Sequence, residues 1–66
     1  MNITINGSSH DLPSPQTIES VLTFLGMADQ KVVVEHNKEA IFPRDYPQTN
    51  IADGDELEIV TIAAGG

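Results

Sequence analysis

Strand-like segments lie at both ends of this 66-residue chain, and they restrict its fold more than any other feature. Residues 1–5 alternate apolar and polar side chains, which is the period of a β-strand, and residues 55–62 form a second, apolar strand-like segment. A chain of this length buries only about 60% of the surface that it exposes when unfolded. We therefore expect one small domain over residues 1–66, with the two end strands side by side in a single thin core.

The first strand-like segment is followed by a hairpin signal and then by a helix signal. Asn6-Gly7 is typical of a tight turn because both positions tolerate positive φ, and residues 8–12 are expected to form the returning strand. Thr17 is the expected N-cap of a helix of about nine residues that Gly26 closes. One apolar stripe is predicted on this helix, made of Ile18, Val21, Leu22 and Leu25.

The second half of the chain predicts two more strands before the last one. Residues 31–35 are rich in β-branched side chains, with Val32 and Val34 expected to face the helix, and residues 39–42 form a short strand-like segment. Residues 44–50 are expected to be irregular, with Ile51 as a core residue. Together these elements predict an α+β chain with the β-grasp (ubiquitin-like) arrangement, a mixed sheet of four to five strands with one main helix across one face.

The last strand predicts an exposed apolar surface. If Leu57 and Ile59 face the helix, then Glu58, Val60 and Ile62 face the opposite side of the sheet. An exposed apolar patch on a small protein usually marks a surface that contacts a partner. A register shifted by one residue would exchange the two faces, so this surface depends on the predicted alternation.

The chain ends in four small residues, Ala63, Ala64, Gly65 and Gly66. We expect residues 63–66 to form a flexible tail directly after the last strand. Because two glycines have wide backbone freedom, such a tail can be threaded into a narrow slot of a partner, and the Gly66 carboxylate can be approached from either face. Small residues also collect at chain ends that have no function, so the tail alone does not decide the matter.

Composition excludes several kinds of chemistry. The chain has no cysteine, so it offers no disulfide, thiolate nucleophile or thiolate ligand. Ten acidic against three basic residues give a net charge of -7, which disfavours nucleic acid and favours a basic protein partner. No membrane span or targeting signal is predicted, which indicates a cytoplasmic protein. His10 and His36 fall in different elements, so we predict neither a metal site nor a catalytic group.

As an ordered set, these motifs resemble the ThiS family of bacterial sulfur carrier proteins of thiamin biosynthesis. The resemblance covers essentially the whole chain, and it departs at Lys38, where the family often has glycine. It rests on Ile3-Thr4-Ile5-Asn6-Gly7, Thr17-Ile18, Leu25-Gly26, Val34-Glu35-His36-Asn37, Pro43-Arg44, Asp53-Gly54-Asp55, Glu58-Ile59-Val60 and Ala64-Gly65-Gly66.

The resemblance implies a carrier protein and not an enzyme. A ThiF-like adenylyltransferase would use ATP and Mg²⁺ to adenylate the Gly66 carboxylate, so that this chain binds no cofactor itself. A persulfide donor, either a cysteine desulfurase or a rhodanese-type protein, would convert Gly66 into a thiocarboxylate. A ThiG-like thiazole synthase would take the sulfur into the thiazole ring of thiamin.

Three alternatives remain at this point. The first keeps the carrier function but delivers sulfur to molybdopterin or to tRNA. The second is a ubiquitin-like modifier that is conjugated to proteins through Gly66. The third is a plain binding module that uses the open sheet face and has an idle tail.

Overall fold

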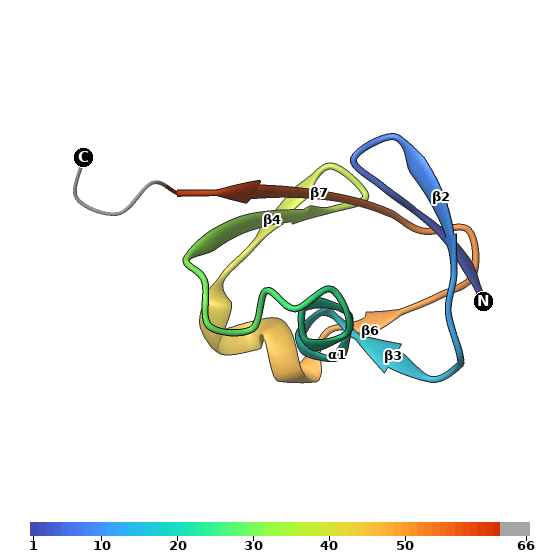
Figure 1. Cartoon of the computed structure of the whole chain (residues 1–66), viewed down its shortest axis with the longest axis horizontal. Helices are drawn as coiled ribbons and strands as arrows, with labels where there is room; N and C mark the ends of the chain where they lie inside the picture. Colours follow the sequence, from blue (N-terminus) through green and yellow to red (C-terminus); the bar gives the residue numbers. More distant parts are fainter. Residues whose placement is uncertain (63–66) are drawn as a thin grey trace.

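The computed structural model describes residues 1–62 and shows a five-stranded mixed sheet with one α-helix across one face (Figure 1). The first and last strands run parallel and are paired inside the sheet, with Thr4 opposite Glu56 and Ile5 opposite Leu57. This arrangement confirms the predicted α+β class and β-grasp topology. Across the sheet the order is β2 (Ser8–Asp11), β1 (Asn2–Ile5), β7 (Glu56–Thr61), β4 (Val32–His36) and β5 (Glu39–Ile41).

The β1–β2 hairpin turns at the predicted dipeptide. Asn6 has φ 49° and Gly7 has φ 82°, which is the left-handed conformation that a tight turn requires. The Asn6 side chain also continues the pairing of β1 with β7. Its Nδ2 donates to the Ile59 carbonyl at 3.0 Å, and its Oδ1 accepts from the Ile59 N–H at 2.7 Å. One amide side chain therefore replaces one residue of the ladder.

The helix α1 (Ile18–Phe24) begins where the sequence predicts. Thr17 Oγ1 accepts from the Ser20 N–H at 3.1 Å, and Ser20 Oγ accepts from the Thr17 N–H at 2.7 Å, so both groups are capped reciprocally. The helix has seven residues instead of about nine, because Leu25 already serves as the C-cap. Within residues 1–62, no helix has the length and apolarity that crossing a membrane requires.

The core lies between α1 and the sheet. As predicted, Val32, Val34, Leu57 and Ile59 are buried on the face toward the helix, and Ile51 is a core residue. The helix contributes the first three residues of its predicted stripe, whereas the fourth, Leu25, is only partly buried. The complete buried set is Ile3, Ile5, Leu12, Ile18, Val21, Leu22, Val32, Val34, Tyr46, Ile51, Leu57 and Ile59.

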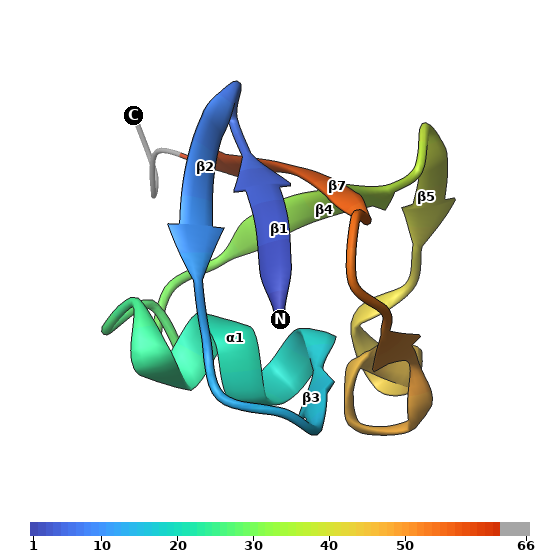
Figure 2. The ribbon, with the colours of Figure 1, turned by 90° about the vertical axis from the view of Figure 1, so that its right-hand side faces the viewer.

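The segment before the last strand is ordered, and the prediction of an irregular segment over residues 44–50 was wrong. The 3-10 helix η1 (Pro43–Gln48) is followed by β6 (Asn50–Ile51), which pairs with β3 (Gln16–Thr17) beside the N-terminal end of α1 (Figure 2). Pro43 stands at the start of η1, where its fixed φ suits a helical turn. Only Tyr46 of this helix is buried, so the segment has no apolar periodicity to reveal it.

Candidate functional site

The predicted tail residues Ala63, Ala64, Gly65 and Gly66 lie outside the described residues. Ile62 is the last described residue, and its N–H donates to the carbonyl of Lys31 at 2.9 Å. The last described residue is therefore fixed to the beginning of β4. The point from which residues 63–66 extend is thus set by the sheet.

The sheet face opposite α1 carries the predicted exposed surface. Figure 2 shows α1 below the sheet and the other face uncovered by any described segment. Val60 lies directly opposite Val33 in the β4–β7 ladder, and their side chains are 60% and 46% exposed. Glu58 lies directly opposite Glu35, and both are exposed. We call Val33, Glu35, Glu58 and Val60 the open sheet face.

Like charges directly across an antiparallel pair destabilise a sheet. The Glu35–Glu58 pair therefore lowers the stability of the free domain, next to an apolar pair that is left in water. Both features would be relieved by a surface that offers apolar groups and cations. The role of Glu58 and Val60 in binding a partner stays a prediction.

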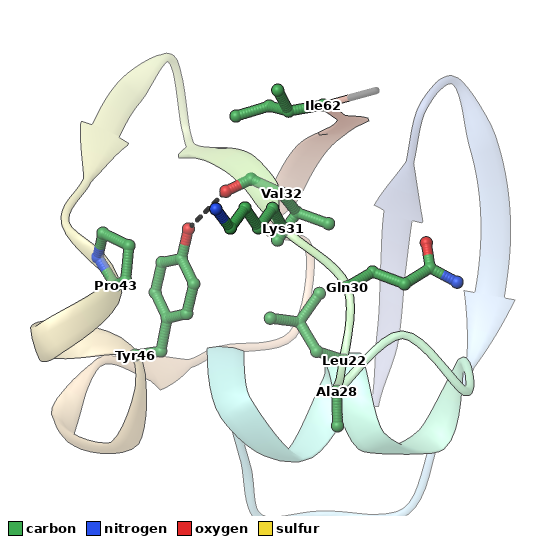
Figure 3. Close-up of a pocket in the computed structure, with 8 residues that line it drawn as sticks. All are labelled: Leu22, Ala28, Gln30, Lys31, Val32, Pro43, Tyr46 and Ile62. Atoms are coloured by element: carbon green, nitrogen blue, oxygen red, sulfur yellow. Dashed lines mark hydrogen bonds between the residues drawn. The ribbon is translucent and has the colours of Figure 1, made fainter. Parts of the chain in front are cut away.

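Ile62 was predicted to face the same side as Glu58 and Val60, and this placement was wrong. Because β7 ends at Thr61, Ile62 lies beyond the strand alternation and borders a groove on the side of the sheet where α1 lies. This groove has a volume of about 450 Å³, and its walls are largely apolar. In Figure 3, Tyr46 and Pro43 form one side of the groove, Leu22 lies on the other, and Ile62 lies above Lys31 and Val32. Sequence reasoning missed this groove, because its walls come from segments far apart in the chain. The single tyrosine of the chain, between Pro43 and Pro47, was the one sequence feature that could have indicated the groove.

A carboxylate fixes the turn that leads into β7. Asp55 Oδ2 accepts from the Ala52 N–H at 2.8 Å and lies 2.7 Å from His36 Nε2. Asn37 Nδ2 donates to Asp55 Oδ1 at 3.2 Å, and Asn37 Oδ1 accepts from the Glu56 N–H at 2.9 Å. The network ties the β4–β5 turn to the start of β7.

Burial tends to raise the pKa of Asp55, but the hydrogen bonds from His36, the Ala52 N–H and Asn37 outweigh it and hold this pKa below its usual value of 3.8. The His36 and Asp55 side chains are only 17% and 16% exposed. Among residues 1–62, no group of three His, Asp or Glu side chains is arranged to hold a metal ion. His36, Asn37 and Asp55 hold the base of β7 against the β4–β5 turn.

Comparison with known proteins gives consistent matches over the whole chain. The model of the ThiS family matches residues 3–66. Thiazole synthases from Paramagnetospirillum magneticum and Magnetococcus marinus are 39% and 35% identical to it over 66 residues. The chain spans 20% of the length of each of these two proteins.

A solved structure matches the fold over its full length. The crystal structure of the thiamine biosynthesis protein (ThiS) from Geobacter metallireducens superposes with a TM-score of 0.85 and is 29% identical. The match covers 100% of both chains. The mixed sheet and the helix across it are thus shared with a protein of the same size.

Proposed function

The chain belongs to the ThiS family, and from this premise we propose that it is a sulfur carrier whose Gly66 supplies sulfur for the thiazole ring of thiamin. One observation carries the proposal: the family match runs from residue 3 through Gly66 and so includes residues 63–66. The names of the two similar thiazole synthases favour thiazole formation over delivery to molybdopterin or tRNA, and over conjugation to proteins.

The chemistry of a terminal glycine explains why a partner enzyme is required. A terminal carboxyl has a pKa of about 3.3–3.7, so it is ionised at neutral pH and resists nucleophilic attack. Activation as an acyl adenylate requires cations around the phosphates of ATP. This chain has only three Lys and Arg residues against ten Asp and Glu. We therefore assign ATP, Mg²⁺ and catalysis to a ThiF-like adenylyltransferase, with this chain as its substrate.

Sulfur transfer then follows in two steps. The terminal sulfur of a persulfide, on a cysteine desulfurase or a rhodanese-type protein, attacks the activated carbon of Gly66, and AMP leaves with the former carboxylate oxygen. A second thiol reduces the acyl disulfide and releases Gly66 as a thiocarboxylate. A thiazole synthase of the ThiG type is the proposed acceptor, and the use of ATP and a persulfide suits the cytoplasm.

The last described residue is held in place, and this supports a tail that is presented to a partner from a fixed position. The Ile62 N–H donates to the carbonyl of Lys31, the residue just before β4, so residues 63–66 extend from a defined point. The open sheet face beside it combines the exposed Val33–Val60 pair with the Glu35–Glu58 pair. Such a surface suits a partner with apolar and basic groups around the entrance to its active site. The tail residues Ala63, Ala64 and Gly65 would then enter that site without steric hindrance.

The test is the intact mass of the protein after incubation with the adenylyltransferase, ATP and a sulfur donor from the same cell. We expect a gain equal to the exchange of one oxygen for sulfur. A variant without Gly66 and a variant with one alanine added after Gly66 should both keep their original mass. The second variant is the matched control, since it retains all native residues and blocks only the carboxylate.

Two results would contradict the proposal. One is an unchanged mass of the wild type although the enzyme is active on another carrier. The other is attachment of Gly66 to lysines of other proteins, which would indicate a modifier.

A further inference from the structure

We propose that the groove bordered by Ile62 receives an apolar side chain of the enzyme that adenylates Gly66. This inference rests on the proposed function and assigns a second docking point to it. The occupant is an aliphatic or aromatic residue that has a carboxylate next to it.

The tail is too short for the partner to stay away from the groove. Residues 63–66 separate Ile62 from the reacting carbon, and a fully extended chain of four residues spans at most about 13–14 Å. The reacting atoms of the partner must therefore come within this distance of Ile62. Since Ile62 is fixed to Lys31, the surface around the partner's active site has to cover this end of the sheet.

Two apolar surfaces meet at this end of the sheet. Val60 belongs to the open sheet face, whereas Ile62, two residues later, borders the groove on the side of α1. Both side chains are largely exposed, at 60% and 52%. A partner that surrounds the tail contacts both, so the groove continues the proposed docking surface around the end of β7.

The walls of the groove are held by the core and do not depend on a ligand. Leu22, Val32 and Tyr46 are 5%, 9% and 8% exposed. The Tyr46 hydroxyl donates to the Val32 carbonyl at 3.3 Å, which fixes the ring against β4 (Figure 3). A preformed apolar pocket of about 450 Å³ is large enough for one bulky side chain. Anchors of this kind supply much of the binding energy of protein interfaces.

The charge at the groove differs from that of the open sheet face. Lys31 is exposed and lines the groove, whereas Glu35 and Glu58 lie on the open sheet face. The partner should therefore present cations to the open sheet face and a carboxylate beside the apolar anchor. The groove is positively charged and the open sheet face is negatively charged, and this difference would fix the orientation of the carrier on its partner.

The test compares adenylation kinetics of variants at the groove with matched variants elsewhere. Ala28 lines the groove and is exposed, so Ala28→Phe reduces the groove without changing a buried residue. Ala52→Phe adds the same bulk in the turn before β7. Lys31→Glu reverses the charge at the groove, and Lys38→Glu does so in the β4–β5 turn. Urea unfolding of each variant confirms that it is folded.

We expect Ala28→Phe and Lys31→Glu to raise the KM for the carrier about tenfold, the effect of losing one anchor contact. The kcat should stay unchanged because the tail is intact, and Ala52→Phe and Lys38→Glu should behave as the wild type. Wild-type kinetics of the two groove variants would overturn the docking alone. Equal effects at the control positions would do so as well. A wild type that is not adenylated at all would overturn the proposed function together with the docking.

Measurements on the free protein test whether a group other than a partner side chain occupies the groove. A dimer that dissociates in Ala28→Phe would place a second copy in the groove. Changes in the NMR signals of Tyr46 on removal of residues 63–66 would place the chain's own tail there. Either result would overturn the proposal of a partner side chain.

Discussion

Asp55 fixes the position at which β7 begins, because one carboxylate joins three groups. It accepts hydrogen bonds from the Ala52 N–H and from Asn37, and it contacts His36 Nε2 at 2.7 Å. In the folded protein the hydrogen bonds outweigh burial and lower the pKa of Asp55 from 3.8. A lowered pKa means that the ionised carboxylate stabilises the fold.

We predict that Asp55→Asn lowers the free energy of unfolding by about 1–3 kcal/mol at neutral pH, since a partly buried, charged acceptor is lost. The contribution of the carboxylate is present above the unfolded pKa and is lost as the pH falls through the lower, folded pKa. The difference between wild type and variant should therefore shrink in acid. Urea unfolding at a series of pH values measures it.

Asp29→Asn is the matched control, because it removes the same charge from an exposed position in the loop after α1. Its effect should stay within about 0.5 kcal/mol at every pH. A difference for Asp55→Asn that stays constant down to about pH 2 would show that ionisation of this carboxylate does not stabilise the fold.

At the scale of elements, the central β1–β7 pairing depends on a side chain where β1 ends. The two hydrogen bonds of Asn6 to Ile59 hold β7 beyond the last backbone pair. We predict that Asn6→Gly costs about 1–3 kcal/mol of stability, because it removes both bonds while keeping a residue that tolerates φ 49°. The amide hydrogen exchange of Ile59 should accelerate with it.

Lys38→Gly is the control, because Lys38 also has positive φ, at 70°, in an exposed turn. Glycine relieves strain there, so this variant should be neutral or slightly more stable. If both variants lose the same stability, the effect comes from the flexibility of glycine in the unfolded chain and not from the bonds to Ile59.

Elements with a clear period were predictable from the sequence, and elements that depend on distant partners were not. The alternation in β4 and β7 assigned Val34 and Ile59 to the core correctly. By contrast, β3 and β6 have two residues each and exist only because they pair with one another. Two residues cannot display a period of two, so neither strand leaves a signal in the sequence.

The candidate site also has one part that the sequence predicted and one part that it did not. The exposure of Val60 followed from its place in the last strand, and Figure 2 shows that face of the sheet uncovered within residues 1–62. The groove could not be predicted, because Leu22, Tyr46 and Ile62 meet only when α1, η1 and the end of β7 are packed. Tyr46 lies in a segment with two prolines, and its burial could be known only from the tertiary structure.

At the scale of the whole molecule, the net charge of -7 would speed encounter with a basic partner, and the distribution of this charge would orient the chain on that partner. Two carboxylates face each other on the open sheet face, at Glu35 and Glu58, although this costs stability. A surface that is kept at such a cost is expected to contribute to binding. A substitution that removes this repulsion should then raise the stability of the fold and slow association with the partner.

We predict that Glu58→Gln raises the free energy of unfolding by about 0.2–1 kcal/mol, because it removes the repulsion from Glu35. The same variant should associate with the adenylyltransferase at least about twofold more slowly at low ionic strength, since the partner's cations lose an attractive charge. High salt should abolish the difference in association rate. Urea unfolding and stopped-flow association measure the two effects.

Glu19→Gln changes the net charge equally at the first turn of α1, on the covered side of the sheet. It should leave the association rate near that of the wild type and slightly lower the stability, because an acid at a helix N-terminus is favourable. Equal slowing by Glu19→Gln and Glu58→Gln would mean that only the total charge attracts the partner. Slowing by Glu58→Gln alone, in a more stable protein, would show that the carboxylate pair serves binding at the expense of the fold.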